Sequence, residues 1–320
     1  MQDFIHLHVH TYYSILDGQS SIAKLVDKAV ANGMKGMAVT DHGDMFGIKE
    51  FFDYCNKVNG GRKKEGLEPF KPIFGCEMYV ARHRKEDKNK DNGDRGGYHL
   101  IVLAKNYRGY KNLIKLVSNA WVDGFYGRPR TDRAELEKYH EDLIVCSACI
   151  AGEVPRKILA DDIEGARESI EWHKRVFGDD YYLELQRHEV KDPAIRANRD
   201  TFPLQQKANK VLCSNDAHFV DQENAEAHDH LLCLSTGKDL DDPTRMLYSK
   251  QEWFKTREEM NEVFADIPEA LSNTLEVLDK VEFYDIENPP IMPFFPIPED
   301  FGTEEEWRRK YTDEDIFNEF

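Results

Sequence analysis

The chain has 320 residues, a net charge of −17 and a hydrophobic content of 40 %. That hydrophobic content is ample for a sizeable core and excludes a disordered chain, and the length suits one large domain or two small ones. No apolar stretch approaches the roughly 18 to 20 residues that a membrane span requires, so we expect no membrane association.

The distribution of charge and the spacing of the cysteines bear on the substrate and on the cellular location of the chain. Residues 221–320 hold 27 acidic and 9 basic residues, whereas residues 1–220 hold 33 and 34. The overall charge therefore neither supports nor excludes a phosphate-bearing substrate for the first part of the chain. The six cysteines lack the spacing of a disulfide framework, and no signal peptide is visible. We therefore predict a cytoplasmic location.

Three histidines open the chain: His6, His8 and His10 alternate with apolar residues. Alternation with a period of two predicts a β-strand over 3–10, with the three imidazoles on one face. The Cα atoms of His8 and His10 should lie about 6.6 Å apart, close enough to share one metal ion, whereas His6 and His10 should lie about 13 Å apart. We therefore expect one of the three to have another role. The alternative is a solvent-facing edge strand with polar histidines.

The rest of the chain alternates between strand and helix patterns. The predicted strands are 3–10, 36–40, 72–80, 98–104, 143–149, 181–186 and 210–214. The predicted helices are 21–32, 46–59, 107–121, 133–139, 162–177 and 194–209, and Asp132 with Glu135 resembles a capping box at the start of one of them. This alternation predicts an α/β fold closed as a barrel, with its chemistry at the C-terminal ends of the strands.

Two segments interrupt this pattern. The charged segment 82–95 favours a mobile, solvated loop over a contact with a phosphate backbone. Prolines between 289 and 298 indicate an extended connector. The acidic helical stretch after it stops at Phe320 without a cap, so we expect the chain to be the front of something longer.

Side chains that can bind metal ions occur at successive strand ends. Nine are candidate ligands: His8, His10, Asp17, His42, Glu77, His99, Cys149, Asp216 and His218. Nine mixed nitrogen, oxygen and sulfur ligands are too many for one tetrahedral ion and suit two or three ions. Two ions about 3.5–4 Å apart can clamp the attacking and leaving oxygens of a phosphoryl displacement. The set therefore predicts phosphoester hydrolysis.

Each candidate alone has a simpler explanation. His99 could be a hydrogen-bonded core histidine, and it lies near the start of its strand rather than the end. Cys149 could be a small buried hydrophobic residue, and its C-x-x-C with Cys146 has no second such pair. His228 and His230 repeat the H-x-H spacing, but in a helical stretch they point about 200° apart, and we interpret that pair as structural. The prediction therefore depends on the joint occurrence of the nine.

The motifs resemble those of a known family, the polymerase and histidinol phosphatase (PHP) superfamily. The residues that carry the resemblance are His6–Thr11, Thr40–Gly43, Gly75–Glu77 and Asn215–His218. Further motifs look like the N-terminal region of the bacterial replicative DNA polymerase III alpha subunits: Tyr13–Gly18, Gly97–Leu100, Gly124–Arg130 and Pro289–Pro293.

The resemblance implies a fold and a domain division. It implies a distorted seven-stranded β/α barrel over residues 1–285, the PHP fold. Residues 286–320 would be the Pro-rich connector and the start of the polymerase palm region. The paired aspartates of the polymerase site would lie beyond this chain, and Asp313–Asp315 do not match them. The parent protein would therefore polymerise DNA, and this chain alone would not.

The resemblance also implies a metal site and an activity. All nine candidates would hold two or three divalent ions, Zn²⁺ and/or Mn²⁺, with Mg²⁺ and Fe as further possibilities. The catalytic residues would be His8, His10, Asp17, Asp216 and His218. An intact cluster implies 3′–5′ exonuclease chemistry, with the DNA 3′ end and the other domains and subunits of the replicase as partners. Two alternatives stay open: a silent metal-binding module that supports the polymerase, and a pyrophosphatase or phosphomonoesterase.

Overall fold

The computed structural model describes residues 1–89, 94–188, 210–293 and 302–310. The chain divides into two compact units, residues 1–286 and 287–320. In the second unit the described structure contains helix α11 (Glu304–Lys310). The assignment of residues 286–320 to the beginning of a polymerase region stays a prediction.

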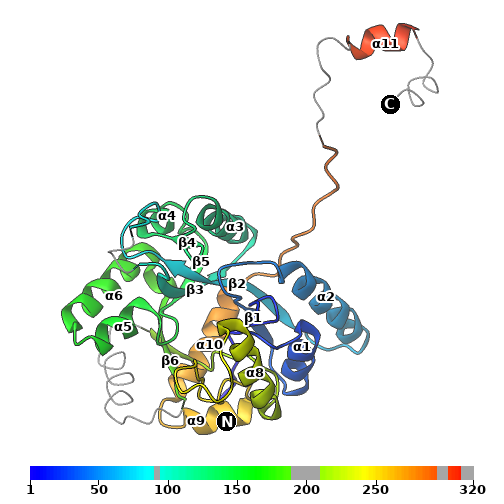
Figure 1. Cartoon of the computed structure of the whole chain (residues 1–320). Helices are drawn as coiled ribbons and strands as arrows, with labels where there is room; N and C mark the ends of the chain where they lie inside the picture. The colour runs from blue at the N-terminus through cyan, green and yellow to red at the C-terminus, as the bar shows by residue number, and fades with distance from the viewer. Residues whose placement is uncertain (90–93, 189–209, 294–301, 311–320) are drawn as a thin grey trace. The chain divides into compact units, whose positions relative to one another are not determined.

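The first unit is built on a mixed sheet of seven strands. Its order is β1 (Gly36–Val39), β2 (Lys71–Val80), β3 (Tyr98–Ala104), β5 (Leu143–Cys146), β6 (Tyr181–Gln186) and β7 (Lys210–Ser214), and β4 (Arg130–Thr131) pairs with β2. Strand β3 runs antiparallel to both of its neighbours, whereas the other pairs are parallel. The sheet curls into a half-barrel with helices around it (Figure 1), which confirms the predicted α/β fold.

The predicted strand over 3–10 is not a regular strand, although the segment is extended. The N–H groups of Ala38 and Thr40 donate to the carbonyls of His6 and Val9 at 2.8 and 2.9 Å. Between these two hydrogen bonds the first segment advances by three residues and the segment that contains β1 by only two. This extra residue is the feature of a β-bulge, and it interrupts the regular hydrogen-bond ladder. On its other side, His10 N–H donates to the Ala217 carbonyl at 2.8 Å. The segment thus joins β1 to the chain just after β7, and β4 is the seventh strand in its place.

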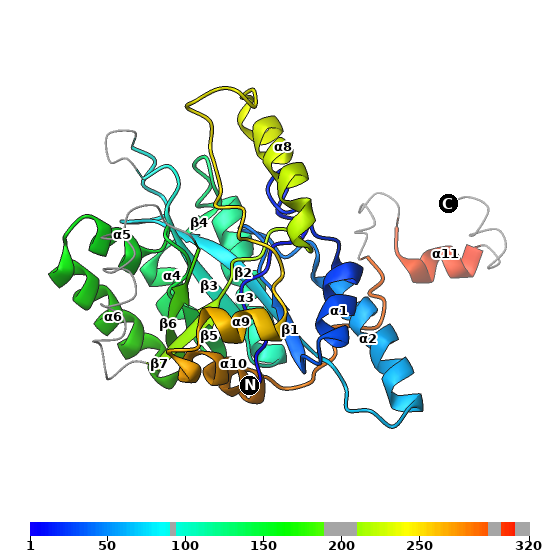
Figure 2. The same cartoon turned by 90° about the horizontal axis from the view of Figure 1, so that it is seen from below.

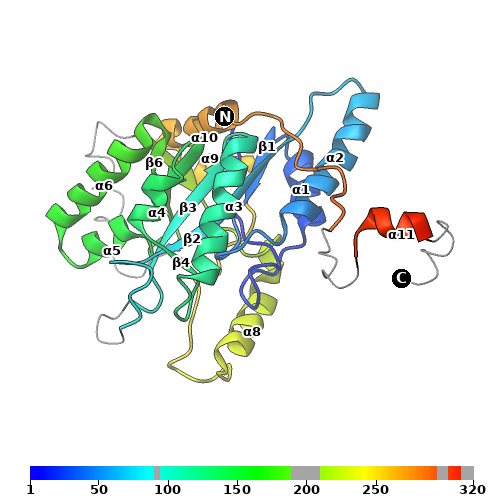
Figure 3. The ribbon, with the colours of Figure 1, turned by 90° about the horizontal axis from the view of Figure 1, so that it is seen from above.

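Helices surround the strands (Figure 1). They are α1 (Ile22–Ala31), α2 (Ile48–Lys64), α3 (Tyr107–Val122), α4 (Arg133–Lys138), α5 (Glu153–Leu159), α6 (Ile163–Phe177), α8 (Ala225–Thr236), α9 (Arg257–Val263) and α10 (Pro268–Lys280), with short 3₁₀ turns at Gly178–Asp180 and Gln222–Asn224. Figure 2 shows α1 and α2 on one side of the sheet and α5 and α6 on the other. Helix α3 packs along β3 (Figure 3). The predicted helix over 194–209 lies outside the described residues.

The start of α4 follows the predicted capping signal in part. The Asp132 side chain accepts the Glu135 N–H at 2.9 Å, which satisfies one of the unpaired donors of the first turn. The Glu135 carboxylate does not return the bond and instead accepts from Asn119 Nδ2 at 2.6 Å. The helix is therefore capped on one side, without the reciprocal bond of a capping box.

Both faces of the first segment are buried. Ile5, Leu7 and Val9 pack in the hydrophobic core, and the side chains of His8 and His10 on the other face are also 0 % exposed. The alternative of a solvent-facing edge strand is therefore wrong. Polar rings with no access to water require partners inside the protein or a bound ligand.

Segment 82–95 is not a solvated loop throughout. Lys85 and Asp94 are both only 4 % exposed. They lie against Arg130, whose guanidinium is completely buried and donates to the Lys85 and Asp94 carbonyls at 3.0 and 2.9 Å. The charges of this segment therefore contribute to an internal network as well as to the surface.

Two other expectations concern the chain as a whole. All six cysteines lie among the described residues, and none of them forms a disulfide. In the described part of the chain, no helix is both long and apolar enough to cross a membrane.

Candidate metal centre

The nine candidate ligands converge at one edge of the sheet. They come from the 6–10 segment (His8, His10), the loop after it (Asp17), the chain after β1 (His42), β2 (Glu77), the start of β3 (His99) and the loops after β5 and β7 (Cys149, Asp216, His218). The position of His99 follows from the direction of β3. Because β3 is antiparallel, it begins where its neighbour β2 ends, and His99 pairs with Tyr79.

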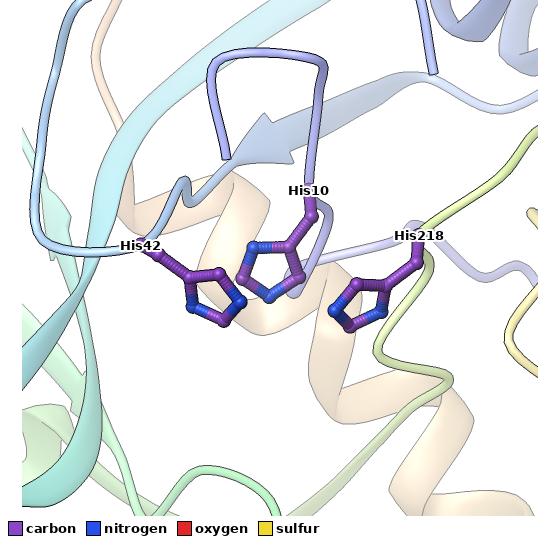
Figure 4. A group of neighbouring side chains, drawn as sticks. All are labelled: His10, His42 and His218. Atoms are coloured by element: carbon purple, nitrogen blue, oxygen red, sulfur yellow. The ribbon is translucent and has the colours of Figure 1, made fainter. Parts of the chain in front are cut away.

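Eight of the nine fall into three groups, two of which share His10, and in each group the ligand atoms lie within 4.8 Å of one another. The groups are His10, His42 and His218; His8, His10 and Asp216; and Glu77, His99 and Cys149. Figure 4 shows the three imidazoles of the first group side by side. The ninth candidate, Asp17, joins this group through its Oδ2, which lies 2.8 Å from His42 Nε2.

The carboxylate of Glu77 lies between the groups. Its Oε1 is 2.8 Å from His99 Nδ1 and 3.2 Å from His8 Nε2. Its Oε2 is 2.5 Å from His42 Nδ1 and 3.8 Å from His10 Nε2. One side chain thus touches imidazoles from all three groups, which is the arrangement of a carboxylate that two ions could share.

Hydrogen bonds orient the first two rings. The Nδ1 of His8 lies 2.7 Å from Glu184 Oε1, and a carboxylate can only accept, so this nitrogen carries the proton. The Nδ1 of His10 lies 2.9 Å from Ser14 Oγ, whose own hydroxyl donates to Asp41 Oδ1 at 2.7 Å. Both rings therefore turn Nε2 inward, and these two atoms are 3.1 Å apart.

The unsatisfied atoms of the cluster fit a divalent cation. Among the described residues, Asp17 Oδ1, His42 Nδ1, Glu77 Oε2 and Asp216 Oδ1 are buried without a hydrogen bond. Asp216 Oδ1 nevertheless lies 3.0 and 3.2 Å from the Nε2 atoms of His8 and His10. Buried acceptor atoms that lie close together without hydrogen bonds between them are arranged as the ligands of a shared cation would be. Imidazole, carboxylate and thiol groups together suit ions such as Zn²⁺ or Mn²⁺.

Carboxylates favour the protonated form of two imidazoles of the cluster when no cation is bound. Burial opposes the charged form of two rings, but carboxylates outweigh it: Asp216 raises the pKa of His8, and Glu77 raises that of His42, well above the usual value. Burial and the neighbouring imidazoles lower the pKa of His10 to about 3. A divalent cation would displace the protons of His8 and His42, so its binding should release protons.

Sequence reasoning missed the support for His8. Glu184 on β6 accepts from His8 Nδ1, from Gln186 Nε2 at 3.0 Å and from the Ser214 hydroxyl. The available signal was an acidic residue between Leu183 and Leu185 in a buried strand. A lone charge in such a strand indicates a partner.

It also missed two side chains beside Asp17. His228 on α8 is buried, with its Nε2 3.7 Å from Asp17 Oδ1, whereas His230 is exposed. The helical spacing therefore separates the two as predicted, but the structural interpretation of His228 overlooked this contact. The Tyr248 hydroxyl donates to Asp17 Oδ2 at 3.2 Å, and its loop carries no sequence pattern that could have indicated this.

One of the three first histidines has another role, as expected. His6 Nε2 lies 2.8 Å from the Lys255 carbonyl, and its ring packs against Phe254 with centroids 4.0 Å apart. Burial lowers the pKa of His6 to about 3. It is therefore a neutral core histidine that anchors the first segment.

The curled α/β sheet and the cluster of metal-binding side chains at one edge define the class of protein to which this chain belongs. The model of the PHP domain family matches residues 6–188, more than half of the chain, and the chain belongs to this family. Its curated relatives include DNA polymerase III subunit alpha from Borreliella burgdorferi, 44 % identical over 94 % of this chain and 26 % of that protein. The same subunit from Treponema pallidum is 34 % identical over 99 % of this chain and 26 % of that protein.

The matches cover nearly all of this chain but only a small part of each relative. The chain spans about a quarter of the length of the curated relatives that it matches. Among solved structures, histidinol phosphate phosphatase from Lactococcus lactis, in complex with Zn, L-histidinol and phosphate, has a TM-score of 0.38 and 14 % identity. That match covers 74 % of this chain and 95 % of the other.

Proposed function

We propose that the chain is the N-terminal domain of a DNA polymerase III alpha subunit and is a metal-dependent phosphoesterase that removes nucleotides from the 3′ end of DNA. The observation that carries this proposal is the convergence of seven ligand groups around the Glu77 carboxylate, with Asp17 beside them. The relatives support the setting within a polymerase.

Each part of the cluster has a role in this proposal. All nine side chains would hold divalent ions, and such ions would activate water and neutralise the charge of a phosphodiester. His8, His10, Asp17, Asp216 and His218 face the reacting phosphate. Glu184 and Ser14 hold the rings of His8 and His10 in the orientation that presents Nε2 inward.

The proposal also assigns partners. The primer strand would reach the cluster while the parent polymerase holds the duplex, and the other domains and subunits of the replicase would be neighbours of this chain. The proposal places the chain with the replicase in the cytoplasm. Residues 286–320 would continue into the palm region.

The test is a nuclease assay with the chain itself. A primer labelled at its 5′ end and mismatched at its 3′ end is annealed to a template and incubated with the chain and Mn²⁺ or Zn²⁺. We expect shortening from the 3′ end, and we expect Asp216→Asn and His10→Ala to abolish it. His230→Ala is the matched control, because it removes an exposed imidazole outside the cluster and should preserve the activity.

The alternatives predict different results in the same experiment. A metal-dependent rise in melting temperature without turnover would indicate a structural module. Phosphate release from pyrophosphate or a small monoester, without primer shortening, would indicate the phosphatase chemistry. Equal cleavage by the unaltered chain and by Asp216→Asn would point to a contaminating nuclease and refute the proposal.

A further inference from the structure

Exposed aromatic side chains gather beside the metal cluster, and the hydrolysis proposed above does not use them. We define the aromatic groove as the exposed Phe46, Trp121 and Phe125 together with the buried Tyr79 and with Arg128. The side chains of Phe46, Trp121 and Phe125 are 61, 41 and 46 % exposed. Large apolar surfaces that stay in water next to one another are typical of a binding site.

The groove is continuous with the metal cluster. A cavity of about 350 Å³ is lined by all five groove residues and also by Asp17 and His42. The ring of Tyr79 connects the two regions, with its centroid 6.3 Å from that of His42 and 5.1 Å from that of His99. A ligand in the groove therefore reaches the ligands of the proposed metal ions.

Hydrogen bonding and stacking hold the groove in shape. The indole Nε1 of Trp121 donates to the carbonyl of Gly43, the residue after His42, at 2.8 Å. The rings of Trp121 and Phe125 are stacked, with centroids 5.6 Å apart and planes 17° apart. Gly43 has a φ of +65°, and a Cβ there would lie 2.7 Å from Pro129 Cγ. Two nearly parallel aromatic faces are thus preorganised next to the cluster.

A positive charge completes the groove. The Arg128 side chain is exposed, and its guanidinium lies 5.5 Å from the centre of the Tyr79 ring. Among the residues that the structure describes, no carboxylate forms an ion pair with Arg128. Flat apolar faces beside an arginine are the combination that binds single-stranded nucleic acid, with bases on the rings and phosphate at the cation.

We propose that the aromatic groove binds the unpaired terminal nucleotides of single-stranded DNA, with bases stacked on Trp121 and Phe125 and a backbone phosphate at Arg128. This inference rests on the proposed function, since it supplies the substrate class of the same site. It explains why the stacking surfaces lie next to the cluster, because a strand bound in the groove would place its end at the proposed metal site. Only unpaired bases can bind in this way, since paired bases are already stacked on each other.

Binding can be measured without hydrolysis. The probe is a fluorescein-labelled oligothymidylate, titrated with the chain in EDTA at low salt and followed by fluorescence anisotropy. We expect Trp121→Leu to weaken binding about tenfold, because each base that loses a stacking partner loses a substantial part of the affinity. Phe46→Leu should weaken it by a smaller factor.

The matched control is Phe283→Leu. Phe283 is 54 % exposed but lies outside the groove, so its loss should leave the affinity unchanged. A second probe, an abasic strand of the same length, keeps the phosphates and removes the bases. The unaltered chain should bind it more weakly, and Trp121→Leu should weaken it no further, whereas Arg128→Gln should weaken both probes.

The outcomes separate this inference from the proposed function. Equal binding of the base-containing and abasic strands, or equal effects of Trp121→Leu and Phe283→Leu, would overturn the inference even if primers are shortened. Base-dependent binding without any hydrolysis would retain the groove and reject the exonuclease. No binding of either strand would also overturn the inference and favour a protein surface as the partner of the groove.

Discussion

Arg130 and Glu77 are charged side chains that are both completely buried, yet their surroundings differ. Every nitrogen of the Arg130 guanidinium donates within the protein: Nε to Gly124, Nη1 to Asp94, and Nη2 to Lys85 and Asp87, at 2.9 to 3.3 Å. The Glu77 cluster contains buried oxygen and nitrogen atoms with no hydrogen bond among the described residues.

The difference shows how to recognise an internal ligand site. A buried charge is tolerated when hydrogen bonds and an opposite charge replace water. The Arg130 guanidinium meets that requirement with the chain's own carbonyls and the Asp94 carboxylate, although Asp94 Oδ1 is left without a hydrogen bond. The Glu77 cluster meets it only with protons or cations added, so its stability and its chemistry should both respond to metal ions.

Removing the Arg130 guanidinium gives the largest expected effect. Arg130→Met removes the cation and leaves the Asp94 carboxylate buried, which should lower the free energy of unfolding by about 3–5 kcal/mol. Urea unfolding measures this loss, and it should be the same with and without metal ions. Arg156→Met, at an exposed position, should change stability by less than about 0.5 kcal/mol. If the stability lost in Arg130→Met depended on metal ions, the distinction between the Arg130 network and the Glu77 cluster would be wrong.

Addition of metal ions tests whether the Glu77 cluster binds them and is stabilised by them. At a free Mn²⁺ or Zn²⁺ concentration a hundredfold above Kd, binding to the folded state should raise the free energy of unfolding by about 2.7 kcal/mol. Asp216→Asn should lose most of this gain because it removes a charged ligand of the cluster. Arg130→Met should keep it, if the variant remains folded. The measurement is thermal or urea unfolding with and without EDTA, and an equal gain in Asp216→Asn would contradict the ligand assignment.

Glu184 tests whether residues behind the ligands tune the site. Glu184→Gln removes the carboxylate that holds His8 Nδ1–H, so metal affinity should fall about 10- to 100-fold. Isothermal titration calorimetry measures both the affinity and the release of protons. Glu135→Gln is the control, because Glu135 is hydrogen-bonded to Asn119 away from the cluster. Unchanged affinity in Glu184→Gln would show that His8 needs no support.

His173 is a third kind of buried polar group, kept neutral in the core. Burial lowers its pKa from 6.5 to about 4, although the Ser169 carbonyl accepts from its Nδ1. The unfolded chain therefore takes up this proton first as the pH falls, so stability present above pH 6.5 is lost between about pH 6.5 and 4. At pH 5 the loss from this group should be about 2 kcal/mol.

The check for His173 is a difference between two chains. Unfolding is measured at pH 7.5 and at pH 5 in EDTA, for the unaltered chain and for His173→Phe. The variant should show a smaller loss between the two pH values because it has no imidazole to protonate. Parallel pH dependence of both chains would mean that this imidazole is not held neutral.

The sequence by itself determined much of the fold and the residues of the candidate site. The period of two over residues 4–10 predicted His8 and His10 on one face, and the strand ends predicted where the other candidates except His99 would meet. These inferences succeeded because side-chain direction and the position of a strand end are local properties of the chain. The helical spacing that separates His228 from His230 is local in the same way.

The remaining features depend on how distant segments pack together. The antiparallel direction of β3 brings His99 to the cluster, although it begins its strand. The bulge opposite Ala38 and Thr40 prevents a regular first strand. Tyr248 and His228 reach the cluster from segments whose local sequence gives no sign of it, and the acidic residue in buried β6 indicates that Glu184 has a partner but not which one. These features arise from contacts between residues far apart in the chain, which periodicity and spacing within a short segment cannot encode.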